Sequence, residues 1–193
     1  MTVLLYLHGF ASSGNSTKVE HIRKAFPDHI VIAPNLSPQA ARTKLQLTNL
    51  VENLIAEHSG DVLVMGTSLG GFWADYISLK YELKGLIINP STTPHLTLRK
   101  YIGQTIDGFK WVEPDCDDYF DVWYENLWSS RKISKSPRTV LLAKDDDILN
   151  YDIAVNKYRD TANVVLFDSG GHRFERYDDI CKHIRELLNT EVL

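Results

Sequence analysis

The stretch Val62-Leu63-Val64-Met65-Gly66-Thr67-Ser68-Leu69-Gly70-Gly71-Phe72-Trp73-Ala74 decides the expected fold of this chain. It opens with an apolar run that predicts a buried strand, and it continues into residues that predict a helix. A G-x-S-x-G pattern lies between them, so the strand and the helix would meet at Ser68. A bend this sharp is strained, and Gly66 and Gly70 relieve it because a Cβ there would collide with neighbouring backbone. The pattern therefore predicts an exposed serine hydroxyl at the end of a strand.

Five further apolar runs of similar length predict strands elsewhere in the chain. All six runs are short, rich in Val, Ile and Leu, and without polar alternation, as is typical of strands buried on both faces. Amphipathic patterns between them predict helices, the clearest of which cover residues 47–55 and 177–188. The predicted strands are residues 3–7, 30–33, 62–65, 86–88, 139–143 and 164–167.

Alternation of strands and helices predicts βα units and an α/β fold. The expected architecture is a mostly parallel sheet of about six strands with helices on both faces. The length of 193 residues fits a single domain over residues 1–193. In such sheets, ligands bind beyond the carboxyl ends of the strands. We therefore expect the functional residues in the loops that follow the strands.

Residues 91–137 interrupt this alternation. The segment is much longer than a typical connection and shows no clear strand. It contains three of the four tryptophans, and the part between Trp111 and Ser130 has six acidic residues and no Lys or Arg. We interpret it as a lid-like insertion over a pocket, whose aromatic side chains pack in the core or line the pocket. If the acidic part overhangs the pocket, multiply anionic substrates should be disfavoured.

Composition excludes several classes of function. The net charge of −4 is not that of a nucleic-acid-binding protein. No apolar run approaches the roughly 20 residues that span a bilayer, and the amino-terminal residues are typical of a first strand and not of a signal peptide. Cys116 and Cys181 lack metal-ligand or disulfide spacing, so a reducing cytoplasm is the expected location. No phosphate-binding glycine motif is present, and we expect no cofactor.

His172 is the expected partner of Ser68. A serine hydroxyl needs a base to remove its proton during attack, and imidazole has a suitable pKa. His172 follows the last predicted strand directly after two glycines, which let the backbone turn and bring the ring over the sheet edge. His95 is expected at the surface of the insertion. His8 is expected to shape the first loop by hydrogen bonding.

An aspartate should orient the imidazole, and three consecutive candidates follow the strand predicted at residues 139–143. Adjacent side chains at a strand end point in different directions, so one of them can face His172. We favour Asp146, keep Asp145 as the alternative, and expect Asp147 in solvent. The spaced acidic loop of a calcium site is absent, so no metal is expected.

The oxyanion of an acyl-transfer reaction needs two backbone donors. The N–H of Leu69, directly after Ser68, is one expected donor. The other is expected from the loop after the first strand, where His8-Gly9-Phe10 makes the N–H of Phe10 the natural choice.

These motifs together resemble the α/β-hydrolases, and more narrowly the small bacterial serine esterases of the YqiA type. The resemblance extends over essentially the whole chain and is carried by H-G-F, G-T-S-L-G-G, D-D-D-I-L-N-Y and G-G-H in this order. It implies esterase or thioesterase chemistry without naming a substrate. In the resembling family the catalytic aspartate stands two places before an apolar pair. That pair is Ile148-Leu149 here, which supports Asp146.

The sequence therefore predicts a serine esterase that hydrolyses carboxylic esters, or thioesters, of small molecules. Two alternatives stay open. The same residues could serve an acyltransferase or a peptidase, because fold and site chemistry do not determine the acceptor. The chain could also be a binding module that keeps the fold without turnover.

Overall fold

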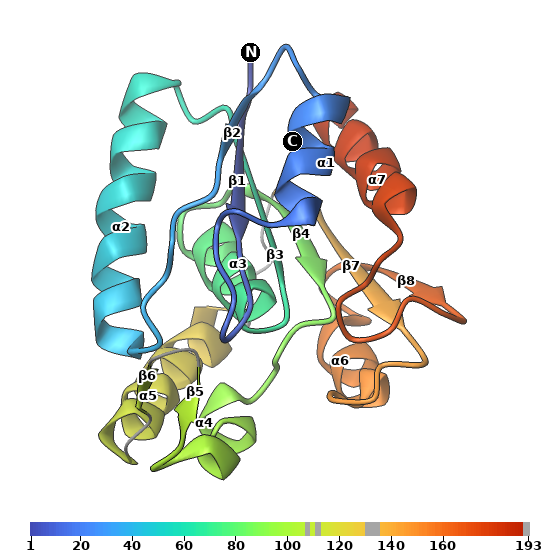
Figure 1. Ribbon diagram of the computed structural model, residues 1–193. Coiled ribbons are helices and arrows are strands. Elements are labelled where there is room, and N and C mark those ends of the chain that lie inside the picture. The colour runs from blue at the N-terminus through green and yellow to red at the C-terminus, as the bar shows by residue number, and fades with distance from the viewer. Residues whose placement is uncertain (107–108, 111–112, 130–135, 191–193) are drawn as a thin grey trace.

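The computed structural model describes residues 1–106, 109–110, 113–129 and 136–190 of the chain. Its centre is a six-stranded sheet in the order β2-β1-β3-β4-β7-β8, in which every neighbouring pair is parallel (Figure 1). The sheet confirms the expected fold and all six predicted strands to within a few residues. The strands are β1 Val3–Leu7, β2 Ile30–Ile32, β3 Val62–Thr67, β4 Lys84–Ile88, β7 Arg138–Ala143 and β8 Asn163–Phe167.

Helices cover both faces of this sheet, as the alternation predicted. Helices α1 and α7 pack on one face, and α2, α3 and α6 pack on the other (Figure 1). The described part of the insertion adds the α-helices α4 and α5 and a 3-10 helix, η1 Arg99–Tyr101. The helices are α1 Thr17–Ala25, α2 Ala40–Glu57, α3 Leu69–Lys80, α4 Pro94–Thr97, α5 Glu113–Ser129, α6 Tyr151–Tyr158 and α7 Tyr177–Asn189.

Strand β1 shows why its sequence lacks polar alternation. Val3, Leu5 and Leu7 point into the core under α2 and α3, whereas Leu4 and Tyr6 point into the core under α1 and α7. All five side chains are buried. A strand covered on both faces has no solvent side, so every position is apolar.

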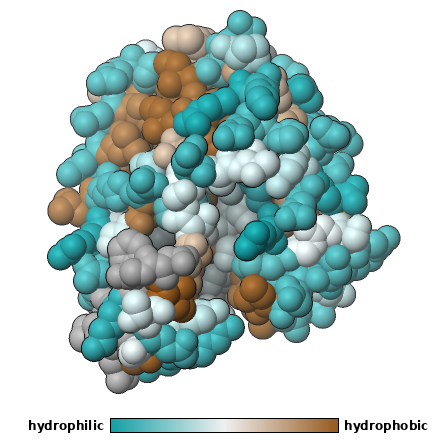
Figure 2. Space-filling view, viewed as in Figure 1, coloured by the Kyte–Doolittle hydropathy of each residue, from teal (hydrophilic) through white to brown (hydrophobic). Residues whose placement is uncertain are grey.

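The outermost strands are less covered. All three residues of β2 are half-buried, and Leu166 of β8 is 44% exposed. Figure 2 shows hydrophobic side chains gathered over the region between α2 and β2. The central strands β1, β3, β4 and β7 are therefore the best covered part of the sheet.

The insertion departs from expectation in one respect. The sequence predicted no strand in residues 91–137, and this was wrong. Strands β5, Thr105–Ile106, and β6, Phe109–Lys110, form an antiparallel pair. Strands of two residues are too short to show a hydrophobic period, and their pairing needs no long apolar run.

Most of the acidic part of the insertion forms helix α5. The ring of Tyr119 on α5 is buried, and its centroid lies 6.2 Å from that of Phe72 and 5.9 Å from that of Trp73 on α3. This contact seats the insertion beside the carboxyl ends of the strands (Figure 1). Tyr119 thus belongs to the core. Trp111 and the side chain of Trp128 lie outside the described residues.

The sequence predicted no membrane-spanning segment and no disulfide framework. Over the described ranges, no helix combines the length and apolar character needed to cross a membrane. Cys116 and Cys181 are both buried and unbridged.

Candidate active site

Ser68 lies between the end of β3 and the start of α3. Its backbone has φ 59° and ψ −120°, a conformation that residues other than glycine rarely adopt. The bend is held by hydrogen bonds, because the N–H of Ser68 donates to the carbonyl of Ile88 at 3.0 Å and the N–H of Ser91 donates to the carbonyl of Ser68 at 3.0 Å. The strained strand-to-helix bend expected from the sequence is therefore present.

The two flanking glycines are required by close backbone contacts. A Cβ on Gly66 would lie 2.1 Å from the carbonyl oxygen of Gly70. A Cβ on Gly70 would lie 2.0 Å from the carbonyl oxygen of Leu7 on the adjacent strand β1. The glycines thus let α3 start directly against the sheet, which projects the Ser68 hydroxyl beyond the strand ends.

The structure brings Ser68, His172 and Asp146 into one hydrogen-bonded chain. The Nε2 atom of His172 lies 3.0 Å from Oγ of Ser68. Its Nδ1 atom lies 3.0 Å from both carboxylate oxygens of Asp146. These residues are separated by up to 104 positions in sequence and follow the strands β3, β7 and β8. The parallel sheet brings them together because all of its strands end at the same edge.

The carboxylate of Asp146 is held in its charged form. Its side chain is 2% exposed, and burial alone would raise its pKa. Hydrogen bonds from His172 and from the N–H groups of Leu149 and Ile148 outweigh burial, so the pKa of Asp146 is below its usual value. Because Asp146 stays ionised, the arrangement favours a proton on Nδ1 of His172 and leaves Nε2 to accept the serine proton.

The neighbouring residues Asp145 and Asp147 do not contact the imidazole of His172 in the described hydrogen bonds. Asp145 accepts a hydrogen bond from the N–H of Gly171 at 2.8 Å, which holds the loop before His172. Asp147 is exposed, as expected. The geometry therefore places Asp146, and not Asp145, against the imidazole.

Sequence reasoning assigned no role to Asn89, which joins the two loops that carry the acid and the histidine. Its Nδ2 donates to the carbonyls of Gly171 at 2.9 Å and His172 at 3.1 Å, and its Oδ1 accepts from the N–H of Ala143 at 2.9 Å. Asn89 is 3% exposed and follows β4 directly. The available signal was an asparagine before proline at a strand end.

The expected oxyanion donors lie on either side of Ser68. Leu69 is the first residue of α3, so its N–H has no acceptor within the helix. The loop after β1 approaches from the other side, and the Cα of Gly9 faces Ser68 so closely that an added Cβ would lie 3.3 Å from the Ser68 Cβ. Phe10 follows Gly9 and lines the cavity that contains Ser68.

His8 holds this loop, as expected. Its Nδ1 lies 2.8 Å from the carbonyl oxygen of Gly9, and its Nε2 accepts from the N–H of Leu36 at 2.8 Å. Burial lowers the pKa of His8, which favours the neutral ring that these two bonds require.

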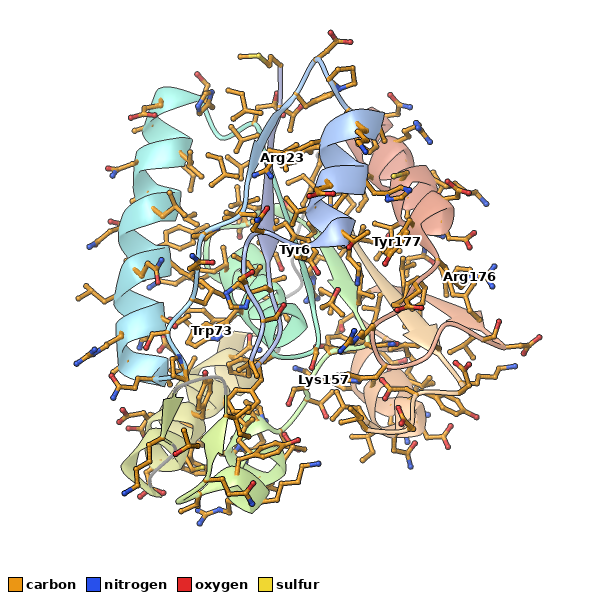
Figure 3. All side chains as sticks on the ribbon, in the orientation of Figure 1. Tyr6, Arg23, Trp73, Lys157, Arg176 and Tyr177 are labelled. Atoms are coloured by element: carbon orange, nitrogen blue, oxygen red, sulfur yellow. The ribbon has the colours of Figure 1, made fainter. Side chains whose placement is uncertain are left out.

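Two cavities lie beside the loop after β1, and Ser68 lines the larger of them. The larger, about 380 Å³, is lined by Ser68 and His172 together with the loop after β1, the start of α1 and the segment before α7. The smaller, about 20 Å³, shares the loop after β1 with the larger one and is lined also by Leu69, Trp73 and Ile106. Trp73 is labelled in Figure 3.

The insertion contributes little to these walls. Among the described lining residues it supplies only Ile106, to the smaller cavity. Two of its acidic side chains pair with bases, Glu125 with Lys44 at 2.5 Å and Asp117 with Arg99 at 3.6 Å. The expectation that an acidic overhang repels anionic substrates therefore has no support in the described walls of the cavity.

His95 corrects a further expectation. It was expected at the surface, but it is 6% exposed and packs against the rings of Trp123 at 4.6 Å and Phe120 at 5.3 Å. The one-turn helix α4, which carries His95, packs on α5, so the imidazole is buried between the two helices. Within the described residues, no group of three or more His, Cys, Asp or Glu side chains is arranged to hold a metal ion.

Comparison with known sequences gives a family match over nearly the whole chain. The model described as "Uncharacterised protein family (UPF0227)" matches residues 3–189. A UPF0227 protein of Pasteurella multocida is 29% identical, covering 96% of this chain and 97% of its own length. One from Pectobacterium carotovorum is 27% identical over 99% of both chains. The resemblance to the YqiA type is thereby confirmed.

Comparison with solved structures gives the fold. Est1E from Butyrivibrio proteoclasticus superposes with a TM-score of 0.73 at 12% identity, covering 98% of this chain and 89% of its own. FphF, a fluorophosphonate-binding serine hydrolase of Staphylococcus aureus, gives a TM-score of 0.67 at 16% identity, covering 98% of this chain and 84% of its own. These likenesses establish the α/β-hydrolase fold.

Proposed function

Since the chain belongs to the UPF0227 family and has the α/β-hydrolase fold, we propose that it is a serine hydrolase that cleaves carboxylic esters or thioesters. One observation carries the proposal, namely the hydrogen-bonded chain from Ser68 Oγ through His172 to the Asp146 carboxylate. A buried carboxylate, an imidazole and a serine in this geometry are what nucleophilic acyl transfer requires. Two of the structural neighbours are named as an esterase and a serine hydrolase, which supports the same chemistry.

In the first half of the reaction, Ser68 Oγ attacks the acyl carbon while Nε2 of His172 takes its proton. Asp146 holds the Nδ1–H and stabilises the imidazolium. The negative charge on the carbonyl oxygen is received by the N–H groups of Leu69 and Phe10, the proposed oxyanion donors. Collapse of the tetrahedral intermediate breaks the bond to the leaving alcohol or thiol, which takes the proton from His172.

In the second half, water attacks the acyl-enzyme carbonyl and gives a proton to His172. The acid is released, and the proton returns to Ser68 Oγ. The two half-reactions use only the substrate, water and the chain's own residues. In this proposed mechanism Ser68 is the nucleophile, His172 is the general base and then the general acid, and Asp146 is the carboxylate that orients His172.

The decisive experiment combines turnover with covalent labelling. A Ser68→Ala protein should lose at least about 10³-fold in kcat on a short-chain aryl ester, because the nucleophile is removed. It should also lose labelling by a fluorophosphonate probe. Ser13→Ala is the matched control, since this serine is exposed on the loop after β1 and contacts Asn15. Undiminished turnover in the Ser68 variant would refute the proposal.

The acceptor can be tested in the same assay. Addition of small alcohols or amines should divert little product from the free acid if water is the acceptor. A dominant transfer product would assign the chain to acyltransferases. Absence of both turnover and labelling in the wild type would indicate a binding module.

A further inference from the structure

Lys18 is a buried ammonium that the proposed mechanism does not use. It is the second residue of α1 and is 8% exposed. Its Nζ donates to Oγ1 of Thr67 at 3.0 Å and to the carbonyl oxygen of Arg173 at 2.6 Å. Both acceptors are neutral, and in the described part of the chain no ion pair joins Lys18 to a carboxylate.

Such a position is unfavourable for a lysine. Removal of an ammonium from water is costly unless an anion compensates for it. Burial accordingly lowers the pKa of Lys18 to about 7, although the more distant carboxylate of Glu175 acts in the opposite direction. A perturbed cation beside a reactive centre is a candidate for a functional group, because an apolar side chain of similar length would fill the same space at lower cost.

Lys18 lines the 380 Å³ cavity that also contains Ser68 and His172. Its partner Thr67 directly precedes the nucleophile. The hydroxyl of Tyr6 also donates to Thr67, at 3.1 Å, and burial raises the pKa of Tyr6 to about 12, so this wall carries no phenolate near neutral pH. Figure 3 shows Tyr6 and Tyr177 on either side of the first turn of α1.

The charges of the described cavity wall leave it cationic. Lys18 and Arg173 contribute positive charge, and Glu175 is the carboxylate among the described lining residues. The cavity also receives the amino-terminal turn of α1 through Ser16, Thr17 and Lys18, and the unpaired N–H groups of that turn add a partial positive charge. With Lys18 protonated the wall has one positive charge in excess, which one singly charged anion would balance.

The position of His172 shows which part of a substrate would occupy this cavity. The imidazole returns its proton to the leaving atom, so the leaving group must lie on the His172 side of the scissile bond. His172 and Arg173 line the larger cavity, and neither lines the smaller one. The leaving group of a substrate attacked by Ser68 would therefore occupy the cavity that contains Lys18.

We propose that Lys18 binds a carboxylate carried by the leaving group of the substrate, an inference that rests on the esterase or thioesterase activity proposed above. The carboxylate supplies the charge that Lys18 lacks, and its arrival stabilises the ammonium form. A charge-assisted hydrogen bond in a partly desolvated cavity is among the stronger polar contacts, so the substrate class is set by charge as well as shape. The alternative is a structural role, in which the two hydrogen bonds of Lys18 only hold Thr67 at the end of β3 and the loop of His172 in position.

The experiment compares three acetate esters with the same acyl group. They are 4-acetoxybenzoate, its neutral methyl ester, and 4-acetoxyphenyl phosphate. Wild type should hydrolyse 4-acetoxybenzoate with a higher kcat/KM than the methyl ester, and the ratio should fall with added salt. In Lys18→Met and Lys18→Gln this ratio should drop about 10-fold, mainly through the KM of the carboxylate ester.

Two comparisons separate recognition from positioning. Gln keeps hydrogen-bond donors but not the charge, so a positional role would be partly rescued in Lys18→Gln, and the proposed role would not. Lys24→Met, at the exposed end of the same helix, should leave the ratio unchanged. Parallel loss of activity on the carboxylate and neutral esters would overturn the proposal. A Lys18-dependent preference for the phosphate ester would overturn the assignment to a carboxylate.

Failure of this inference is distinguishable from failure of the proposed function. If the chain hydrolyses the methyl ester and Ser68 is labelled by a fluorophosphonate, the hydrolase proposal stands whatever the charge preference. If the wild type neither hydrolyses the methyl ester nor reacts with the fluorophosphonate, the hydrolase proposal itself is refuted, and the inference about Lys18 falls with it. Labelling of Ser68 in the Lys18 variants verifies that their site is folded.

Discussion

At the scale of single residues, the site depends on a strained serine and on the side chains that hold its partners. The backbone of Ser68 has a positive φ, a conformation that costs about 1–3 kcal/mol and persists only where the surroundings impose it. Here the surroundings are β3, α3 and the two glycines. The histidine loop is held by hydrogen bonds within its own turn and by Asp145, and Asn89 adds two further hydrogen bonds to it.

We predict that Asn89→Ala lowers kcat by roughly 10-fold or more, because loss of about 1–3 kcal/mol in positioning hydrogen bonds lets His172 drift from Ser68. Asn89→Asp should not restore activity, because a carboxylate cannot donate to the two carbonyls that Nδ2 now contacts. Steady-state kinetics on one ester would measure both. Fluorophosphonate labelling should slow in parallel.

An exposed ion pair that links the ends of β7 and β8 provides the matched control. Lys144 pairs with Asp168 at 2.7 Å, and both side chains are exposed. Lys144→Ala should leave kcat nearly unchanged, because an exposed ion pair is screened by solvent. Equal losses in the Asn89 and Lys144 variants would contradict the role given to Asn89.

At the scale of elements, helix α3 connects Ser68 to the insertion. One end of α3 starts at the Ser68 bend, and Phe72 and Trp73 on its first turns contact Tyr119 of α5. The ring of Phe10 meets that of Tyr101 at 5.1 Å, so the insertion also touches the loop of the second proposed oxyanion donor. The insertion therefore packs against the elements that carry both proposed donors, through α5 at the start of α3 and through Tyr101 at Phe10.

We predict that Tyr119→Ala lowers the free energy of unfolding by about 3–5 kcal/mol, as expected for loss of a large side chain that is 0% exposed. Tyr124→Ala is the control on the same helix, because Tyr124 is 48% exposed and its removal should cost less than about 1 kcal/mol. Urea unfolding of the two variants would measure the difference. Similar values would mean that α5 does not pack on α3 as described.

At the scale of the whole molecule, Asp75 ties four elements together. It lies on α3, is 0% exposed, and accepts from Arg138 of β7 at 2.8 Å and from Lys157 of α6 at 2.9 Å. Asn126 of α5 and Tyr158 of α6 each donate to it at 3.0 Å. One buried carboxylate thus fixes the nucleophile helix against the sheet, α6 and the insertion.

We predict that Asp75→Asn lowers the free energy of unfolding by about 3–5 kcal/mol at pH 7, because Arg138 is left buried without its counter-charge. Burial raises the pKa of Asp75, but Lys157 and Arg138 outweigh it and hold the pKa below the unfolded value of 3.8. The carboxylate therefore contributes its stability above pH 3.8, and that stability is lost as pH falls through the lower folded-state pKa.

Thermal or urea unfolding between pH 7 and pH 3 would measure this dependence. The wild type should lose more stability on acidification than the Asp75→Asn protein, which lacks the titrating group. Asp160→Asn is the control, since its pairing with Arg159 at 3.6 Å is exposed and should matter little. A steeper acid dependence in the Asp75 variant than in the wild type would contradict the assignment.

The sequence by itself determined the features that depend on local chemistry. Buried parallel strands need continuous apolar runs, and a strand-to-helix bend at Ser68 needs glycines on both sides, so both can be recognised within a few residues. The order of Ser68, Asp146 and His172 followed from their places after the third, fifth and sixth predicted strands. Asp146 was favoured over Asp145 from its place after the strand, and the family resemblance supported that choice.

Only the tertiary structure decided which residues meet. The choice of Asp146 depends on a turn whose N–H groups bind its carboxylate, and the short strands β5 and β6 depend on local pairing that leaves no hydrophobic period. Asn89 acts on residues 82 and 83 positions away, and Lys18 contacts Arg173 at a separation of 155. Such contacts leave no pattern in the chain, because they arise where the ends of separate strands converge at one edge of the sheet.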